Sequence, residues 1–261
     1  MSANYFMADL VSDSLSAKMG DEWTNAAVFA PFQNQQALVN EYADCLAVRA
    51  FLRMVELPFH LDERPNAEFM SPTGKVPFLK LQDVIVPEFM PIVDFVSKKG
   101  VQLSGGLTDA QRADMYAHIA LIEEVLKNAE LYILWIEEST YSEVTRHRYG
   151  SAYSWPLHQI LPMLKRREVN KYLSALEWRT KSLDEVIDEA DACFKSLSLK
   201  LANNDYFMGD LPTELDALAF GHLFTILTTE LPNMDLVNCL RKYSNLTDFC
   251  RLIDEKYFKA N

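Results

Sequence analysis

Residues 70–81, MSPTGKVPFLKL, decide the fold of this chain. Residues 72–74 form a turn, and Val76-Pro77 opens an extended run. A proline at the start of a strand, next to a buried sheet, often follows a cis peptide bond. That geometry leaves the backbone N–H and C=O of Val76 facing outward. The stretch therefore predicts a strand that is entered through Pro77, with a backbone pair beside it that a ligand or peptide can reach.

The segments around this stretch alternate between strand and helix signals. A short apolar run, AAVF, fits a buried strand, and Pro58 ends the helix that follows it. Gln82-Asp83 fits a hairpin turn. The predicted elements are, in order, strand 26–29, helix 41–57, strand 59–63, the extended run within 70–81, strand 84–86 and helix 87–99, with Pro87 in its first turn. The proline-entered strand in this setting is typical of thioredoxin-like domains.

After the glycine pair at 105–106 the sequence pattern is helical. Apolar residues recur every three or four positions, and the strand signals do not return. The helices predicted from these stripes are 115–136, 183–201, 212–230 and 245–258. Residues 212–230 are apolar on all sides, so that helix should be central and buried. We predict an N-terminal extension (1–22), an α/β thioredoxin-like domain (23–103) and an all-α C-terminal domain (107–261).

Residues 213–216, TELD, begin the buried helix with a capping box. In this motif Thr213 accepts a hydrogen bond from the backbone N–H of Asp216, and the Asp216 carboxylate reaches back to the Thr213 N–H. Losing such a cap typically costs about 1 kcal/mol of stability. We interpret Thr213 and Asp216 as a structural cap and assign neither a catalytic role.

The proline-entered strand and the capped helix, in this order and at this separation, resemble the glutathione-transferase fold. Longer segments are similar to the metaxin family. They are NAEFMSPTGKVPF (66–78), RYGSAYSWPL (148–157), TELDALAFGHLFTILTT (213–229) and YSNLTDFCRLI (243–253). The similarity runs from about Phe29 to the end of the chain, and these segments are specific to metaxins rather than to transferases in general.

The resemblance to metaxins implies a non-enzymatic role. It implies a subunit of the sorting and assembly machinery on the cytosolic face of the mitochondrial outer membrane, active in protein import and β-barrel assembly. The implied partners are a metaxin-1-like protein, whose C-terminal anchor spans the membrane, and the β-barrel insertase. The family is also associated with mitochondrial Rho GTPase and with kinesin and dynein adaptors, which implies a role in mitochondrial transport along microtubules.

The competing function is a divergent glutathione transferase or peroxidase. Such an enzyme needs a Tyr, Ser or Cys between the first strand and the first helix to activate the thiol of glutathione. Here that link, 31–39, is long and irregular. Tyr42 and Cys45 are the nearest candidates. Cys45 lies within the predicted helix, so we expect it to pack in the core rather than to react.

The pair that holds the γ-glutamyl end of glutathione in transferases is an acid followed by Ser. The matching pair here is Glu88-Phe89, in which a bulky ring replaces the hydroxyl. The resemblance therefore implies only vestigial glutathione-site positions at Val76, Pro77, Glu88 and Phe89. We predict no catalytic residue and no cofactor.

Composition narrows the remaining function classes. The net charge of −12 over 261 residues disfavours nucleic-acid binding. We expect no secretory or mitochondrial leader and no membrane span, which needs about 18 or more uncharged residues. The five histidines show no metal spacing, and His222 should be a core histidine. The four cysteines are scattered, and we expect reduced, core-packed thiols at Cys45, Cys193, Cys239 and Cys250.

Residues 146–181 are basic, in contrast to the acidic chain as a whole. They have a net charge of +6 and are rich in Tyr and Trp. This mixture suits an anionic membrane surface or a protein interface, but it also fits a solvated helix face with aromatic residues packed inward. The candidate partner or membrane face consists of Arg146, Arg148, Trp155, Lys165, Arg166, Arg167 and Lys171. We expect membrane association to be peripheral and to occur through partners.

Overall fold

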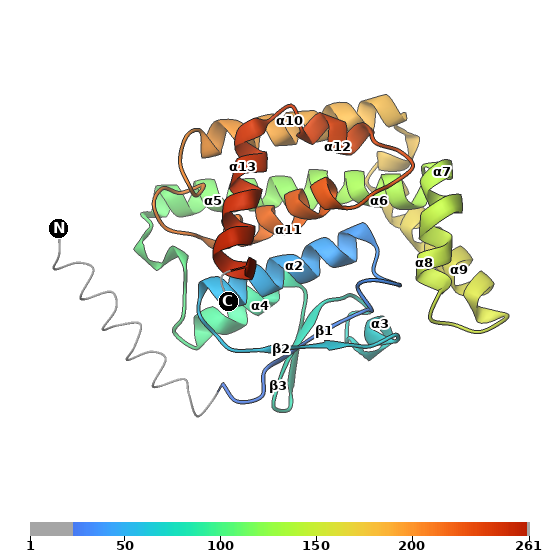
Figure 1. Ribbon diagram of the computed structural model, residues 1–261, viewed down its shortest axis with the longest axis horizontal. Coiled ribbons are helices and arrows are strands. Elements are labelled where there is room, and N and C mark those ends of the chain that lie inside the picture. Colours follow the sequence, from blue (N-terminus) through green and yellow to red (C-terminus); the bar gives the residue numbers. More distant parts are fainter. Residues whose placement is uncertain (1–22, 260–261) are drawn as a thin grey trace.

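The computed structural model describes residues 23–259, so the predicted extension 1–22 lies outside the described residues. A four-stranded sheet forms one layer of the molecule (Figure 1). Its strands are β1 (Ala27–Ala30), β2 (His60–Glu63), β3 (Phe78–Leu81) and β4 (Val84–Pro87). The order across the sheet is β2-β1-β3-β4, with β1 parallel to β2 and antiparallel to β3. The predicted strands and helices of this half occur in the predicted order, with one further helix between β2 and β3.

Three helices accompany the sheet, and their ends differ from the prediction in informative ways. They are α2 (Val39–Met54), α3 (Ala67–Met70) and α4 (Phe89–Lys98). The prediction ended the first helix at residue 57, but it ends earlier because Glu56 adopts a left-handed φ of 56°. The placement of Pro87 in a helix was wrong, since Pro87 pairs with Phe78 at the end of β4. Helix α3 was not predicted because four residues are too few to show periodicity.

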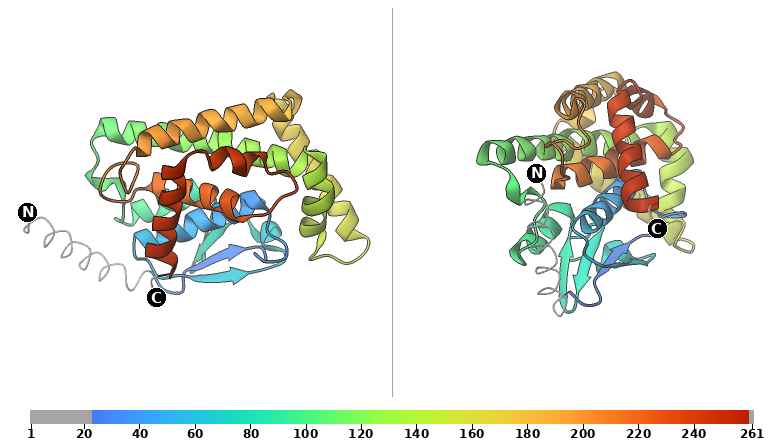
Figure 2. Two further views of the ribbon diagram at one scale, coloured as in Figure 1. Left: turned by 45° about the horizontal axis from the view of Figure 1, so that its top comes forward. Right: turned by 60° about the vertical axis from the view of Figure 1, so that its left-hand side comes forward.

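The rest of the chain forms a helical layer on one side of the sheet, which Figure 2 shows in two further views. The principal helices are α5 (Asp109–Leu121), α6 (Lys127–Trp135), α7 (Glu138–Thr140), α8 (Arg146–Gly150), α9 (Leu157–Ala175), α10 (Leu183–Leu201), α11 (Glu214–Thr228), α12 (Asp235–Leu240) and α13 (Ser244–Asp254). A π-helical turn, Ile122–Leu126, joins α5 to α6. The long helix predicted at 115–136 is therefore confirmed as one continuous run, apart from its last residue.

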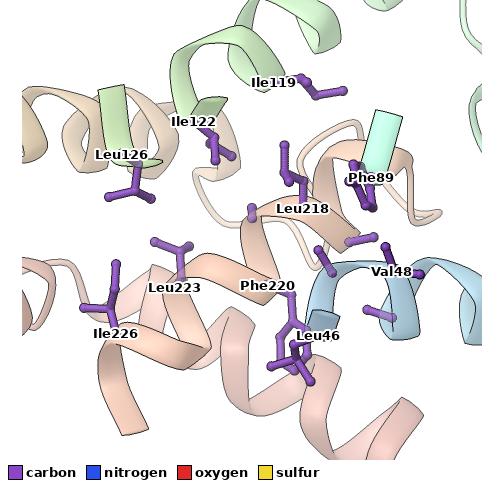
Figure 3. Packing of buried hydrophobic residues seen from close by; sticks show 14 of the residues in the cluster. Leu46, Val48, Phe89, Ile119, Ile122, Leu126, Leu218, Phe220, Leu223 and Ile226 are labelled. Atoms are coloured by element: carbon purple, nitrogen blue, oxygen red, sulfur yellow. The ribbon is translucent and has the colours of Figure 1, made fainter. Parts of the chain in front are cut away.

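Helix α11 is the central helix of the molecule and packs directly on α2. All but a few of its side chains are buried, as its apolar sequence predicted. A Cβ atom added to Gly221 would lie 2.4 Å from the backbone oxygen of Ala43 and 2.7 Å from the Cβ of Ala47. The two helix backbones thus touch at this glycine. Figure 3 shows Phe220 of α11 against Leu46 of α2 in the same contact.

This contact makes one hydrophobic core out of the two predicted domains, from Trp23 to Ile253. A short helical turn, Ser104–Gly106, occupies the predicted join between them. The Glu214 carboxylate accepts hydrogen bonds from the N–H (3.3 Å) and the hydroxyl (3.2 Å) of Ser104. The domain boundaries themselves stay a prediction.

The start of α11 is held by a buried acid. Asp216 Oδ2 accepts from both the N–H and the hydroxyl of Thr213, each at 2.7 Å. Its other oxygen accepts from the N–H of Phe207 at 2.8 Å. Burial raises the pKa of Asp216 to about 6, against the effect of these hydrogen bonds. The carboxyl therefore fastens the preceding loop to the central helix as well as capping it.

Two predictions about the whole chain can be placed on this fold. Within residues 23–259, no helix combines the length and the apolar character needed to cross a bilayer. All four cysteines are free and buried, as predicted, in α2, α10, α12 and α13.

Candidate functional site

The Val76–Pro77 peptide bond is cis, as the sequence predicts. Gly74, two residues earlier, has a φ of +70°, a conformation that glycine adopts without a steric cost. The Pro77 carbonyl accepts a hydrogen bond from the N–H of Glu88 at 3.0 Å. This bond places the start of α4 beside residues 74–77, which we call the proline loop. Val76 is 7% exposed and lines a cleft between the sheet half and the helical half.

The cleft has a volume of about 240 Å³. The first turns of α2 contribute Asn40, Glu41 and Asp44, and the proline loop contributes residues 74–76. Helices α6 and α9 close the other side. The remaining lining residues are Glu68, Glu88, Glu123, Lys127, Asn128, Leu131, Lys165, Glu168, Val169 and Tyr172. Carboxylates, amides and three lysines thus dominate its wall.

Each of the three lysines is held by a carboxylate within hydrogen-bond distance. Lys75 Nζ lies 2.6 Å from Glu88, and Lys165 Nζ lies 2.6 Å from Glu68. Lys127 binds two acids, Asp44 at 2.8 Å and Glu123 at 3.0 Å. The Lys165–Glu68 and Lys127–Asp44 pairs join the sheet half to the helical half. The lysine charges are therefore neutralised inside the cleft and are not available to bind an anion.

A second polar layer lies behind the cleft. His222 of α11 is fully buried, and its Nδ1 lies 2.9 Å from Glu130 of α6. Its Nε2 lies 3.5 Å from Asp44 of α2. Burial by itself would lower the pKa of His222, but the two carboxylates raise it to about 9. The predicted core histidine is confirmed, and it is a charged link between three helices.

Two of the four vestigial glutathione positions, Glu88 and Phe89, are occupied by internal contacts. The Glu88 carboxylate is bound to Lys75. Phe89 is buried and packs edge-on against Phe51, with ring centroids 6.1 Å apart. Burial raises the pKa of the Cys45 thiol to about 11, which disfavours the reactive thiolate.

No group of three His, Cys, Asp or Glu side chains within the described part of the chain is arranged to hold a metal ion.

Three of the seven residues predicted as a partner or membrane face turn inward instead. Lys165 points into the cleft, as described above. Arg148 donates to the backbone oxygens of Gln33 (3.2 Å) and Asn34 (3.5 Å). Arg166 donates to Glu138 at 2.6 Å and stacks over the Tyr141 ring at 3.8 Å. The structure therefore corrects the composition of this face, because charge counting cannot tell which basic side chains are paired internally.

The outward side of the same segment is apolar as well as basic. Helices α8 and α9 project from one end of the molecule (Figures 1 and 2). Trp155 is 77% exposed at the turn between them. We define the α9 face as the exposed residues Trp155, Leu157, Ile160, Met163, Leu164, Arg167 and Lys171. The aliphatic members were missed in the sequence, although positions 157, 160 and 164 share the helical spacing of a second stripe.

Family profiles match both halves of the chain. A profile described as an outer mitochondrial membrane transport complex protein matches residues 45–166. A second, described as the C-terminal domain of glutathione S-transferase, matches residues 190–253. The boundary between the two profiles lies within the helical layer, so neither corresponds to one half of the fold.

Curated relatives extend over most of the chain. The metaxin-2 homolog of Caenorhabditis elegans is 47% identical over 228 residues, which is 87% of this chain and 99% of that protein. Human metaxin-2 is 46% identical over 235 residues, covering 90% of this chain and 89% of its own length. Mouse metaxin-1 is 33% identical over 224 residues, with 82% and 70% covered.

Solved structures with low sequence identity share the fold. Glutathione transferase F7 from Populus trichocarpa superposes with a TM-score of 0.55 at 11% identity, covering 90% of this chain and 96% of that one. FzlA from C. crescentus gives a TM-score of 0.55 at 13% identity, with 89% of each chain covered. The predicted fold class, a thioredoxin-like domain followed by an all-α domain, is confirmed.

Proposed function

The chain belongs to the metaxin family, and on that premise we propose that it is a non-enzymatic subunit of the sorting and assembly machinery of the mitochondrial outer membrane. The observation that carries the proposal is its 46% identity to human metaxin-2 over 90% of the chain. The outer-membrane transport profile over residues 45–166 supports the same location. In this role the protein takes part in protein import and β-barrel assembly from the cytosolic face.

The residues at the glutathione-site positions of the cleft support a non-enzymatic role. A transferase must bind the γ-glutamyl end of its substrate and lower the pKa of its thiol. Here Glu88 is bound to Lys75, and Phe89 stands where a hydroxyl would bind. The nearest thiol, Cys45, has a raised pKa. Binding, rather than turnover, is the function that this arrangement favours.

We infer that the α9 face docks a metaxin-1-like protein, which holds the chain at the membrane. A Trp flanked by aliphatic side chains and Arg has the composition of the energetic centre of a protein interface. Leu164 and Met163 are 51% and 52% exposed, and Trp155 is 77% exposed. The side chains of Arg167 and Lys171 form no hydrogen bond or ion pair with the other described residues. Their charges are therefore available to acidic groups of the partner.

Two further sets of partners follow from family membership. The β-barrel insertase is the partner in assembly. Mitochondrial Rho GTPase and the kinesin and dynein adaptors are the partners in a second role, transport along microtubules. These proposals rest on the resemblance, and the same capture experiment separates them.

The test is capture of the tagged full chain from gently solubilised mitochondria, with mass spectrometry of the bound proteins. Variants for the α9 face are Leu164→Ser and the double change Arg167→Glu with Lys171→Glu. Lys165 and Arg166 are left intact because reversing them would break internal ion pairs. Matched controls lie on α10, where Leu199 is 72% exposed and Lys195 is also exposed. These controls are Leu199→Ser and Lys195→Glu.

We expect the native chain and both controls to recover a metaxin-1-like protein and the insertase. The α9 variants should recover each at least tenfold less, because residues at the energetic centre of an interface typically contribute about 2 kcal/mol or more. Equal recovery by all variants would refute the α9 face. Recovery of neither partner by the native chain, together with glutathione conjugation activity, would refute the subunit role in favour of a transferase. Motor adaptors among the captured proteins would establish the transport role.

A further inference from the structure

We propose that the cleft beside the cis proline binds the ammonium group of a primary alkylamine, either a lysine side chain of a polypeptide or a free polyamine. This goes beyond the proposed function and does not depend on it. The proposal rests on three features of the lining: its surplus of carboxylates, its unpartnered hydrogen-bond acceptors, and one apolar side.

The carboxylates of the cleft outnumber its lysines by three. They are Glu41, Asp44, Glu68, Glu88, Glu123 and Glu168, against Lys75, Lys127 and Lys165. Every lysine already contacts at least one of them. Glu41 forms no ion pair with the other described residues; its Oε2 accepts only from the N–H of Leu38, at 3.1 Å. Burial raises the pKa of Glu41 to about 7, so this carboxyl group is partly protonated at neutral pH. A cation that enters the cleft would favour its charged form, whereas an anion would disfavour it.

Unpartnered acceptors belong to two other residues that line the cleft. Asn128 is 2% exposed, and its Nδ2 donates to the backbone oxygen of Glu124 at 2.6 Å. This bond fixes the orientation of the amide, because the carbonyl of Glu124 can only accept. The Oδ1 of Asn128 has no hydrogen-bond partner, and the same is true of Asn40 Oδ1. Buried acceptors are nearly always satisfied in proteins, and an ammonium group supplies three donors at once.

The walls suit the hydrocarbon part of an alkylamine. Val76 and Val169 are buried lining residues, and Leu131 and Tyr172 complete the apolar side. Tyr172 is 49% exposed, so its ring lies at the mouth rather than at the floor. We expect a methylene chain to lie along these residues with its ammonium group toward the polar part of the lining. Glutathione, in contrast, carries two carboxylates and one ammonium group, so its net charge is negative and the surplus of carboxylates in the cleft disfavours it.

The first experiment is an NMR titration of the isotope-labelled full chain. The probe is lysine with both ends blocked (Nα-acetyl-lysine N-methylamide), and the matched control ligand is the norleucine analogue, which lacks the amine. We expect saturable shifts confined to amides of α2, α6 and the proline loop with lysine and none with norleucine. Equal responses to the two ligands, or no saturable response to lysine, would overturn the proposal whatever the variants show.

Two variants locate the site. Glu41→Gln removes the charge but keeps an oxygen for the Leu38 N–H, and Asn128→Ala removes the free acceptor. Each should weaken lysine binding at least about tenfold, the usual effect of losing one hydrogen bond to a charged group. The control Glu143→Gln changes an exposed acid on another helix and should leave the affinity unchanged. Unchanged affinity in both site variants would show non-specific binding to an acidic protein and would overturn the proposal.

Spermidine and glutathione complete the set of probes. Tighter binding of blocked lysine than of spermidine identifies a polypeptide side chain as the source of the amine, and the reverse order identifies a free polyamine. Saturable binding of glutathione at the same amides, tighter than that of either amine, would refute the charge argument and the proposal with it. Because the readout is binding to the isolated chain, a failure here leaves the capture experiment unaffected.

Discussion

Adding one methyl group at Gly221 should destabilise the whole protein. A Cβ atom there would lie 2.4 Å from the Ala43 backbone oxygen and 2.7 Å from the Ala47 backbone nitrogen. An ordinary contact begins near 3.4 Å, so α2 and α11 must separate by about 1 Å. The contact is with backbone atoms, which cannot rotate away as a flexible side chain can. The strain must therefore spread through the core that joins the two halves.

The magnitude of the effect follows from two opposing terms. Overpacking a core typically costs about 1–3 kcal/mol, and we take the upper end because backbone must move. Replacing a helical glycine by alanine returns about 1 kcal/mol of helix propensity. The variant Gly221→Ala should thus lose about 2 kcal/mol of unfolding free energy. For a chain of this size that corresponds to a fall in Tm of roughly 4–8 °C.

Thermal unfolding followed by circular dichroism measures this directly. The matched control is Gly106→Ala, since a Cβ atom at Gly106 would meet no other atom within 4 Å. We expect the control to change the stability by less than about 0.5 kcal/mol. A Tm for Gly221→Ala that equals or exceeds that of the native chain would refute the backbone contact between the two helices.

Three further predictions concern buried groups. His222 has a folded-state pKa of about 9, raised from 6.5, so its contribution to stability is fully present below pH 6.5 and is lost as the pH rises through 9. Urea unfolding below pH 6.5 and above pH 9 should show this loss of unfolding free energy in the native chain and not in His222→Gln. Thr213→Val should lower the unfolding free energy by about 1 kcal/mol in the same assay, whereas an unchanged midpoint would contradict the cap. The four cysteines are buried, and burial raises the pKa of Cys45 to about 11. An aromatic disulfide reagent should therefore label none of them in the native protein and all four in guanidinium. Rapid labelling of the native chain would contradict their burial.

Much of the fold was predictable because its signals are local. Pro77 indicates the start of a strand through its own backbone chemistry. Residues 212–230 are apolar on all sides, which favours burial of the whole helix. The capping pair, Thr213 and Asp216, lies within one helical turn. The ends of helices were less accurate, as Pro87 shows, because the residue that it pairs with, Phe78, lies in a different strand.

The candidate site could be predicted only in part for the same physical reason. The sequence placed Val76 and Glu88 beside the proline loop, since both are close to it along the chain. It could not show that Lys165 folds back to Glu68, about a hundred positions earlier, while Arg167 points outward.

The sequence by itself determined the strands, the helices with a long apolar stripe and which helix is buried, because backbone preference and hydrophobic periodicity act over a few residues. The short α3 and the mostly exposed α9 carry no such core stripe and were not predicted. Only the tertiary structure decided which charges neutralise one another, because electrostatic pairing depends on distance in space. The surplus of carboxylates in the cleft and the basic edge of the α9 face both result from that pairing, and neither is a property of any single segment.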